Sequence, residues 1–258
     1  MTGTHQGNSA WVRRFHPAPQ APARLICLPH AGGSASYYFP VSSALSPGID
    51  VVAVQYPGRQ DRRHEPPVDD LRTLADLAVP EILPLLDRPT ILFGHSMGAT
   101  VGFEIAVRLA AAGVTPHALF VSGRRAPSAF RDERVHLYRD DKFINDLKRL
   151  AGTDPQMFEH EELIRMILPA LRSDYRAAET YRWTPTLPLT CPIVALIGDS
   201  DPLVTVNEAR AWADHTAAEF ELGVYPGGHF YLNDHASAVM AQLTDQFRRT
   251  AAATARTG

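Results

Sequence analysis

Short apolar runs alternate with longer amphipathic segments along most of this chain. The short runs predict buried strands at about 24–28, 49–54, 90–93, 118–121, 192–197 and 219–224, with an early edge strand at 11–15. The longer segments predict helices at about 36–45, 70–86, 99–112, 207–216 and 236–248. Because strands and helices alternate so regularly, we predict an α/β fold with a mostly parallel central sheet flanked by helices on both faces.

The alternation stops between about residues 128 and 188. No segment there has the pattern of a strand, and helical pieces are predicted at about 141–150 and 159–182, with a kink at Pro169. We therefore expect a single domain over residues 1–258, with a helical lid inserted at about 128–188 above the C-terminal end of the sheet. The alternative is that these helices only add a further covering layer.

Composition and charge are those of an ordinary globular protein. The 258 residues are 45% hydrophobic and 21% charged, and the net charge of -3 gives no electrostatic basis for binding nucleic acid. Cys27 and Cys191 lie in apolar runs, and their spacing fits neither a disulfide framework nor a metal site. Residues 1–10 lack the apolar core of a signal peptide, and no run of about 18 apolar residues follows. We expect a cytoplasmic enzyme that does not enter the membrane.

The most informative motif is Gly94-His95-Ser96-Met97-Gly98, which joins the predicted strand at 90–93 to the predicted helix at 99–112. A GxSxG pattern at such a junction predicts a nucleophile elbow, a turn so sharp that the serine is strained and its hydroxyl is exposed above the sheet. Side chains at positions 94 and 98 would collide across the turn, which explains the glycines. Ser96 is therefore the candidate nucleophile.

A serine hydroxyl needs a histidine to accept its proton, and in enzymes with a nucleophile elbow that histidine follows the serine in the chain. His229 comes just after the predicted strand at 219–224, so we expect it at the same end of the sheet as Ser96. His235 lies near the start of the last helix, where a capping or surface role fits better. His95 is adjacent to Ser96, but neighbouring side chains of a tight elbow point apart.

The histidine in turn needs an acid that holds it in the right tautomer. Two candidates follow the predicted strand at 192–197, Asp199 and Asp201. We choose Asp201, because an acid a few residues beyond the strand has the reach to meet His229, whereas Asp199 lies closer to the strand end and can fix the turn. The pair is too small a cluster for a metal site, and no HExxH motif is present, so we expect neither a metal nor a cofactor.

Acyl transfer also requires donors for the tetrahedral oxyanion, and backbone N–H groups are suited to this because they are fixed before the reaction starts. We expect one donor from Met97, the residue after the nucleophile, and one from the loop after the strand at 24–28, at Ala31. Gly32 and Gly33 allow that backbone to approach. A phosphate cradle is a weaker interpretation of the glycine pair, because no Gly-Lys-Ser/Thr follows it.

Six motifs in this order resemble those of the type II thioesterases, the stand-alone editing enzymes of polyketide and nonribosomal peptide synthases. They are Leu28-Pro29-His30-Ala31-Gly32-Gly33, Tyr56-Pro57-Gly58-Arg59, Gly94-His95-Ser96-Met97-Gly98, Ser122-Gly123-Arg124-Arg125-Ala126-Pro127, Leu168-Pro169-Ala170-Leu171-Arg172-Ser173-Asp174-Tyr175 and Gly227-Gly228-His229-Phe230-Tyr231-Leu232. The resemblance covers residues from about 11 to 248. It implies an α/β-hydrolase fold with a Ser96-Asp201-His229 triad and an oxyanion hole at Ala31 and Met97.

The resemblance also implies a reaction and a partner. Type II thioesterases hydrolyse acyl thioesters on the phosphopantetheine arm of acyl or peptidyl carrier proteins and so remove aberrant or stalled groups. Because carrier proteins are acidic, a basic surface near the entrance is expected. The candidate residues are Arg59, Arg62, Arg63, Arg124 and Arg125.

Two other functions use the same sequence features. A carboxylesterase or lipase acting on free esters would need the same triad, although the predicted lid and the carrier-facing motifs favour the thioesterase. A non-catalytic carrier-binding module on this scaffold would have no need of an intact triad.

Overall fold

The computed structural model describes residues 9–150 and 161–254, and seven strands from these residues form one sheet in the order β1-β3-β2-β4-β5-β6-β7. Strand β1 runs antiparallel to β3, and all other neighbouring pairs are parallel. The strands are β1 (Val12–Arg13), β2 (Ala23–Leu28), β3 (Ile49–Val54), β4 (Thr90–His95), β5 (Ala118–Ser122), β6 (Ile193–Gly198) and β7 (Phe220–Tyr225). The prediction of a mostly parallel sheet is confirmed, and β1 is shorter than the predicted edge strand.

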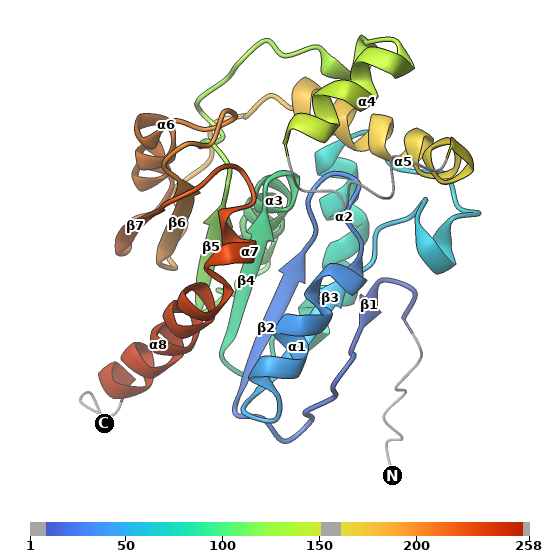
Figure 1. Cartoon of the computed structure of the whole chain (residues 1–258). Helices are drawn as coiled ribbons and strands as arrows, with labels where there is room; N and C mark the ends of the chain where they lie inside the picture. The colour runs from blue at the N-terminus through green and yellow to red at the C-terminus, as the bar shows by residue number, and fades with distance from the viewer. Residues whose placement is uncertain (1–8, 151–160, 255–258) are drawn as a thin grey trace.

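Helices cover both faces of the sheet (Figure 1). They are α1 (Phe39–Leu45), α2 (Leu71–Ile82), α3 (Met97–Ala111), α4 (Asp140–Arg149), α5 (Glu161–Thr180), α6 (Val206–Arg210), α7 (Tyr231–Asp234) and α8 (Ala236–Thr254). Short 3-10 turns are η1 (Ala35–Tyr38), η2 (Gln60–Arg62), η3 (Leu83–Leu85), η4 (Val135–Leu137) and η6 (Ala211–His215). On β2, Ile26 and Leu28 belong to a core shared with α2 and α3, whereas Leu25 and Cys27 belong to one shared with η1 and α8. The strand is therefore buried on both faces, as parallel strands require.

Prolines and caps set the ends of the helix predicted at 70–86. Asp70 accepts a hydrogen bond from the backbone N–H of Thr73 at 2.7 Å and so caps the start of α2. The α-helix ends at Ile82, and the chain continues through the 3-10 turn η3, which contains Pro84. Proline has no N–H to donate to the helix ladder, which accounts for the earlier end.

Helices α4 and α5 lie above the carboxyl ends of the parallel strands, in the segment where the alternation of strands and helices stops (Figure 1). Phe143 and Leu147 of α4 pack with Leu171 of α5 in a small core of their own. Helix α5 continues through Pro169, and the kink expected there stays a prediction, while the predicted helix start near residue 159 lies outside the described residues. None of the helices in the described part of the chain combines the length and apolarity needed to cross a membrane.

Candidate active site

Ser96 stands between the last residue of β4, His95, and the first residue of α3, Met97. Its backbone has φ 53° and ψ -118°. Such a conformation costs a non-glycine residue about 1–3 kcal/mol, so surrounding contacts must hold it. One of them is a hydrogen bond of 2.7 Å from the N–H of Ser96 to the carbonyl of Ser122 at the end of β5. The backbone thus makes the strained turn that GxSxG predicts, with the Ser96 side chain half-buried.

The two glycines of the motif are required by close approach of the backbone. A Cβ at position 94 would lie 2.1 Å from the carbonyl oxygen of Gly98. A Cβ at position 98 would lie 2.1 Å from the carbonyl oxygen of Leu28 at the end of β2. Because both obstacles are backbone atoms, no side-chain rotation can relieve the contact.

His229 and Asp201 are joined by a hydrogen bond of 2.8 Å between Nδ1 of the imidazole and Oδ2 of the carboxylate, and both side chains are buried. The other carboxylate oxygen, Oδ1, accepts the backbone N–H of Leu203 at 2.8 Å. Asp199 is instead exposed and accepts the N–H of Gly227 at 3.0 Å, which fixes the loop after β7. The acid that meets His229 is therefore Asp201, as predicted from its reach beyond the strand.

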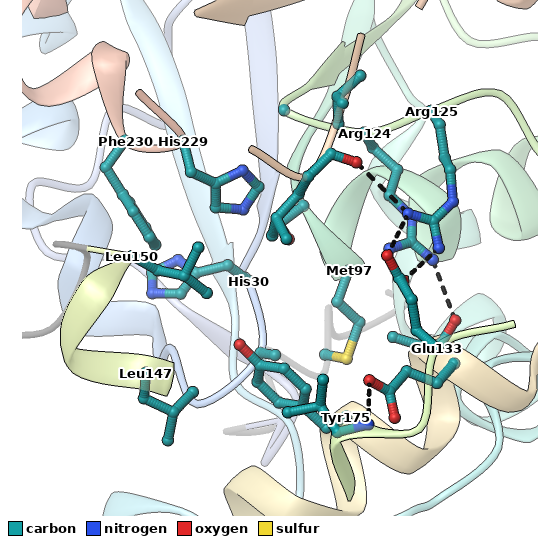
Figure 2. A pocket seen from close by; sticks show the side chains of 18 of the residues that line it. His30, Met97, Arg124, Arg125, Glu133, Leu147, Leu150, Tyr175, His229 and Phe230 are labelled. Atoms are coloured by element: carbon teal, nitrogen blue, oxygen red, sulfur yellow. Dashed lines mark hydrogen bonds and ion pairs between the residues drawn. The ribbon is translucent and has the colours of Figure 1, made fainter. Parts of the chain in front are cut away.

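Ser96 and His229 line one cavity, which encloses about 880 Å³ of empty space, part of it open to solvent. Figure 2 shows His229, Phe230 and His30 on one side of this cavity and Arg124, Arg125 and Glu133 on the other, with Met97 between them. Among the hydrogen bonds of the described residues, none joins the Ser96 hydroxyl to His229. In enzymes that use such a pair, this contact often tightens only when substrate binds.

Met97 and Ala31, the two predicted oxyanion residues, both line the same cavity. Met97 is the first residue of α3, where N–H groups lack an acceptor within the helix. Ala31 lies on the loop after β2. No hydrogen bond of the described residues uses the N–H of Met97 or that of Ala31. These two groups are therefore available to a negatively charged oxygen above Ser96.

Two further histidines surround His229 and are held neutral. Burial first, and the proximity of His229 second, lower the pKa of both His30 and His95, that of His30 to about 3. His95 Nδ1 lies 2.9 Å from the Ser122 hydroxyl, which in turn lies 2.7 Å from the hydroxyl of Tyr231. His95 is fully buried and is absent from the lining of the cavity, which agrees with the packing role expected of it. His235 lies beyond α7 and contacts the carbonyl of Pro226 at 2.9 Å, away from the cavity.

The prediction that five arginines form a basic docking surface is wrong for four of them. Arg59, Arg62 and Arg125 are buried and form ion pairs with Asp174, Glu65 and Glu133, respectively. Arg124 is half-buried and lines the cavity. Only Arg63 of the five is exposed. Arg59 and Arg124 meet acceptors from distant segments, Asp174 and the carbonyl of Ala178, whereas the ion-pair partners of Arg62 and Arg125 lie three and eight residues away in the chain. Residue type alone does not reveal these contacts.

Arg124, Arg125, Glu133 and Glu179 form a polar wall of the cavity, which the sequence analysis did not predict. Arg124 donates to the Thr100 hydroxyl at 3.0 Å and to the carbonyl of Ala178 at 3.1 Å. Burial, followed by the nearby Arg125 charge, lowers the pKa of Arg124 to about 10, so it remains a cation at neutral pH. Glu179 of α5, also on this wall, bonds to His136. The sequence does carry a signal for this wall, because Arg124 and Arg125 follow the end of β5 after a single glycine, at the edge of the sheet where Ser96 lies.

Within residues 9–150 and 161–254, no three His, Cys, Asp or Glu side chains are grouped as the ligands of a metal ion would be. The cavity that Ser96 lines is also lined by His229, which a buried carboxylate contacts, and by Ala31 and Met97, whose N–H groups are in no hydrogen bond of the described residues. Together they can support proton transfer from a serine and stabilise an oxyanion.

Comparison with known proteins gives a consistent result. The family model described as "Thioesterase domain" matches residues 23–247. A probable cadicidin biosynthesis thioesterase of Streptomyces griseus is 52% identical over 245 residues, which cover 95% of this chain and 68% of the relative.

Solved structures give the same picture. The type II thioesterase BorB from the borrelidin biosynthetic cluster superposes with a TM-score of 0.88 at 52% identity, covering 92% of this chain and 98% of BorB. YbtT, a type II thioesterase from the yersiniabactin pathway, was solved as a mutant with one serine replaced by alanine. That mutant superposes with a TM-score of 0.84 at 30% identity, covering 93% of this chain and 99% of YbtT.

Proposed function

This chain belongs to the thioesterase family, and on that premise we propose that Ser96, His229 and Asp201 form its catalytic triad. It is a type II thioesterase of polyketide and nonribosomal peptide biosynthesis. The hydrogen bond of 2.8 Å between His229 and Asp201, beside the cavity that Ser96 lines, most strongly supports the proposed triad.

In the proposed reaction, the Ser96 hydroxyl attacks the thioester carbonyl while His229 Nε2 accepts its proton. Asp201 keeps the other imidazole nitrogen protonated, so that Nε2 is free to act as the base. The N–H groups of Ala31 and Met97 stabilise the oxyanion that forms. The C–S bond then breaks, His229 protonates the departing sulfur, and Ser96 is left acylated.

A water molecule completes the cycle. His229 accepts a proton from this water as it attacks the acyl-Ser96 ester, and a second oxyanion forms at Ala31 and Met97. The intermediate collapses, His229 returns the proton to Ser96, and the carboxylic acid leaves. The net change is hydrolysis of one thioester to an acid and a thiol, with the enzyme unchanged.

We propose that the thiol is the phosphopantetheine arm of an acyl or peptidyl carrier protein, and that the groups removed are aberrant or stalled ones. The chain acts as one domain, in which the segment at about 128–188 serves as a lid. Leu147 and Leu150 of that segment line the cavity with Leu171, which gives an acyl chain an apolar surface opposite the polar wall of Arg124 and Glu133. A cavity with both kinds of lining suits acyl groups that carry some polar substituents.

The experiment that tests this proposal compares two substrates and two enzymes. Ser96→Ala should lower kcat by about 10⁴-fold or more without changing the melting temperature, because a single half-buried oxygen is lost. For the wild-type enzyme, kcat/KM should be higher for an acyl group on a carrier protein than for the same acyl group on a small thiol.

Each rival function predicts a different result. Equal kcat/KM values for the carrier and the small thiol, with faster cleavage of the matching oxygen ester, would favour a carboxylesterase. Carrier binding without turnover by the wild-type protein would favour a non-catalytic module. Hydrolysis by Ser96→Ala at the wild-type rate would contradict the proposed triad.

A further inference from the structure

A buried carboxylate on helix α5 holds the loop that carries Ala31. Asp174 is 1% exposed, and its Oδ2 accepts the backbone N–H of Gly32 at 2.7 Å. Its other oxygen, Oδ1, accepts Nη2 of Arg59 at 2.7 Å, and Nη1 of Arg59 donates to the carbonyl of Gly33 at 3.2 Å. One carboxylate and one guanidinium therefore fix the two residues that follow Ala31.

These contacts reach the Ala31 N–H through rigid peptide planes. The carbonyl of His30 and the N–H of Ala31 belong to one planar peptide unit, so fixing the carbonyl fixes the direction of the N–H. The His30 carbonyl accepts the N–H of Gly33 at 2.9 Å, and Arg59 holds Gly33 from its other side. Asp174 fixes the next peptide unit along, through the N–H of Gly32. The peptide unit that carries the Ala31 N–H is thus held at its carbonyl by Gly33, which Arg59 fixes, and is followed directly by the peptide unit that Asp174 fixes.

The surroundings of the pair leave it little freedom. The Arg59 guanidinium lies 5.1 Å from the centre of the Tyr56 ring. Leu171 of α5 packs so closely on Gly32 that a Cβ there would lie 2.5 Å from Leu171 Cδ1. Burial raises the pKa of Asp174, whereas Arg59 and the Gly32 N–H favour its charged form. Moving Asp174 and Arg59 apart would leave each charge buried without a partner, which is strongly unfavourable. The pair therefore resists movement of the loop that it holds.

We propose that Asp174 is a positioning residue, which acts through Gly32 and Gly33 to aim the Ala31 N–H at the oxyanion of the reaction. This inference rests on the proposed function, in which Ala31 is an oxyanion donor. It also gives α5 a second role beside covering the cavity, since the oxyanion hole is complete only with α5 packed on the Gly32 loop.

The test uses Asp174→Asn in the full-length enzyme and two ligands. One is a trifluoromethyl ketone analogue of the acyl thioester, whose adduct with Ser96 carries an oxyanion, and the other is an unreactive thioether analogue. We expect kcat to fall about 10–100-fold with KM changed by less than about threefold, because a donor that is poorly aimed loses most of its effect. The inhibition constant of the ketone should rise by the same factor as kcat falls, and the dissociation constant of the thioether should stay constant.

Two further variants make the result interpretable. Arg176→Gln removes an exposed ion pair of 3.0 Å with Asp69 from the same helix, and it should match the wild type in every measurement. Arg59→Lys keeps the buried charge but lacks the planar fork that reaches Asp174 and Gly33 together, so it should repeat the Asp174→Asn pattern more weakly. This variant decides the question if Asp174→Asn does not fold.

The inference and the proposed function fail in different ways. Unchanged kcat and ketone affinity in Asp174→Asn and Arg59→Lys would overturn the inference, and so would an equal loss of affinity for the ketone and the thioether. If the wild-type enzyme bound the ketone no more tightly than Ser96→Ala does, the proposed function itself would be overturned.

Discussion

The edge of the sheet that carries Ser96 and the helices that cover it are held by different kinds of contact. At the edge, backbone meets backbone: the Ser96 N–H bonds to the Ser122 carbonyl, and Gly98 lies against the Leu28 carbonyl. Above this edge, α4 and α5 are held together by side chains. Phe143 belongs to the small core between them, and the partly exposed ion pair Arg172–Asp140 joins one helix to the other. Where backbone packs on backbone, no larger residue fits in place of the glycine, whereas a contact between two side chains can be made by other side chains of similar size or charge.

This difference suggests a division of labour. Groups fixed by backbone contacts hold their positions to within a fraction of an ångström, which the chemical step requires. Leu147 of α4, Leu150 at its end and Leu171 of α5 line the cavity, so in the proposed reaction they would contact the acyl group rather than the reacting carbon. Substitutions at the edge should therefore change the rate with every substrate, and substitutions in the cover should change the order of preference among substrates. Asp174 is the exception, because it belongs to the cover and holds the edge.

The sharpest test of the edge is the choice between its two acids. Asp201→Asn should lower kcat about 10⁴-fold, the scale seen when the acid of a serine triad is replaced by an amide that favours the wrong imidazole tautomer. Asp199→Asn is the matched control, since Asp199 is exposed and only holds the Gly227 N–H, and it should cost far less. Steady-state kinetics with one acyl thioester decide the matter, and the opposite ranking would show that the acid is wrongly assigned.

A methyl group at the elbow should affect both stability and rate. Gly98→Ala places a Cβ 2.1 Å from the Leu28 carbonyl oxygen, which should lower the free energy of unfolding by about 3 kcal/mol and reduce kcat with every acyl group. At Gly48 a Cβ would meet only the carbonyl of Leu45 at 3.5 Å, so Gly48→Ala should stay within about 1 kcal/mol of the wild type. Urea denaturation measures both. A fully stable and active Gly98→Ala would mean that α3 can move away from β2 without harm to the site.

The smallest effect is expected in the cover, where Leu150 is half-buried on the cavity wall. Leu150→Phe should reduce kcat/KM for a ten-carbon acyl thioester by about 10-fold and leave the acetyl thioester unchanged, because a small gain in side-chain volume displaces only the longer chain. Leu137→Phe, at a site that is 68% exposed and outside the cavity, is the control. Equal losses with both acyl groups would place Leu150 among the residues that affect the chemical step.

Much of the site follows from the sequence because its determinants are local. The two glycines around Ser96 permit a tight turn with close backbone contacts that any side chain would block, and the apolar runs place that turn at the end of a strand. Since parallel strands end at the same edge, the loops that follow β6 and β7 lie at the same end of the sheet as Ser96. This rule, with the order of serine, acid and histidine along the chain, selects the loops of Asp201 and His229, and the longer reach of Asp201 beyond its strand distinguishes it from Asp199.

The tertiary structure decided what local pattern cannot, namely which charges are buried and what they hold. Arg59 resembles a surface residue in the sequence, yet it pairs with Asp174, which lies 115 positions away along the chain. Asp174 in turn reaches Gly32 across 142 positions. A buried charge is tolerated only where a partner meets it, and partners so distant in the chain are brought together only by folding. The sequence by itself therefore determined the fold, the elbow and the residues that flank it, while folding decided that α5 both covers the cavity and fixes the loop of Ala31.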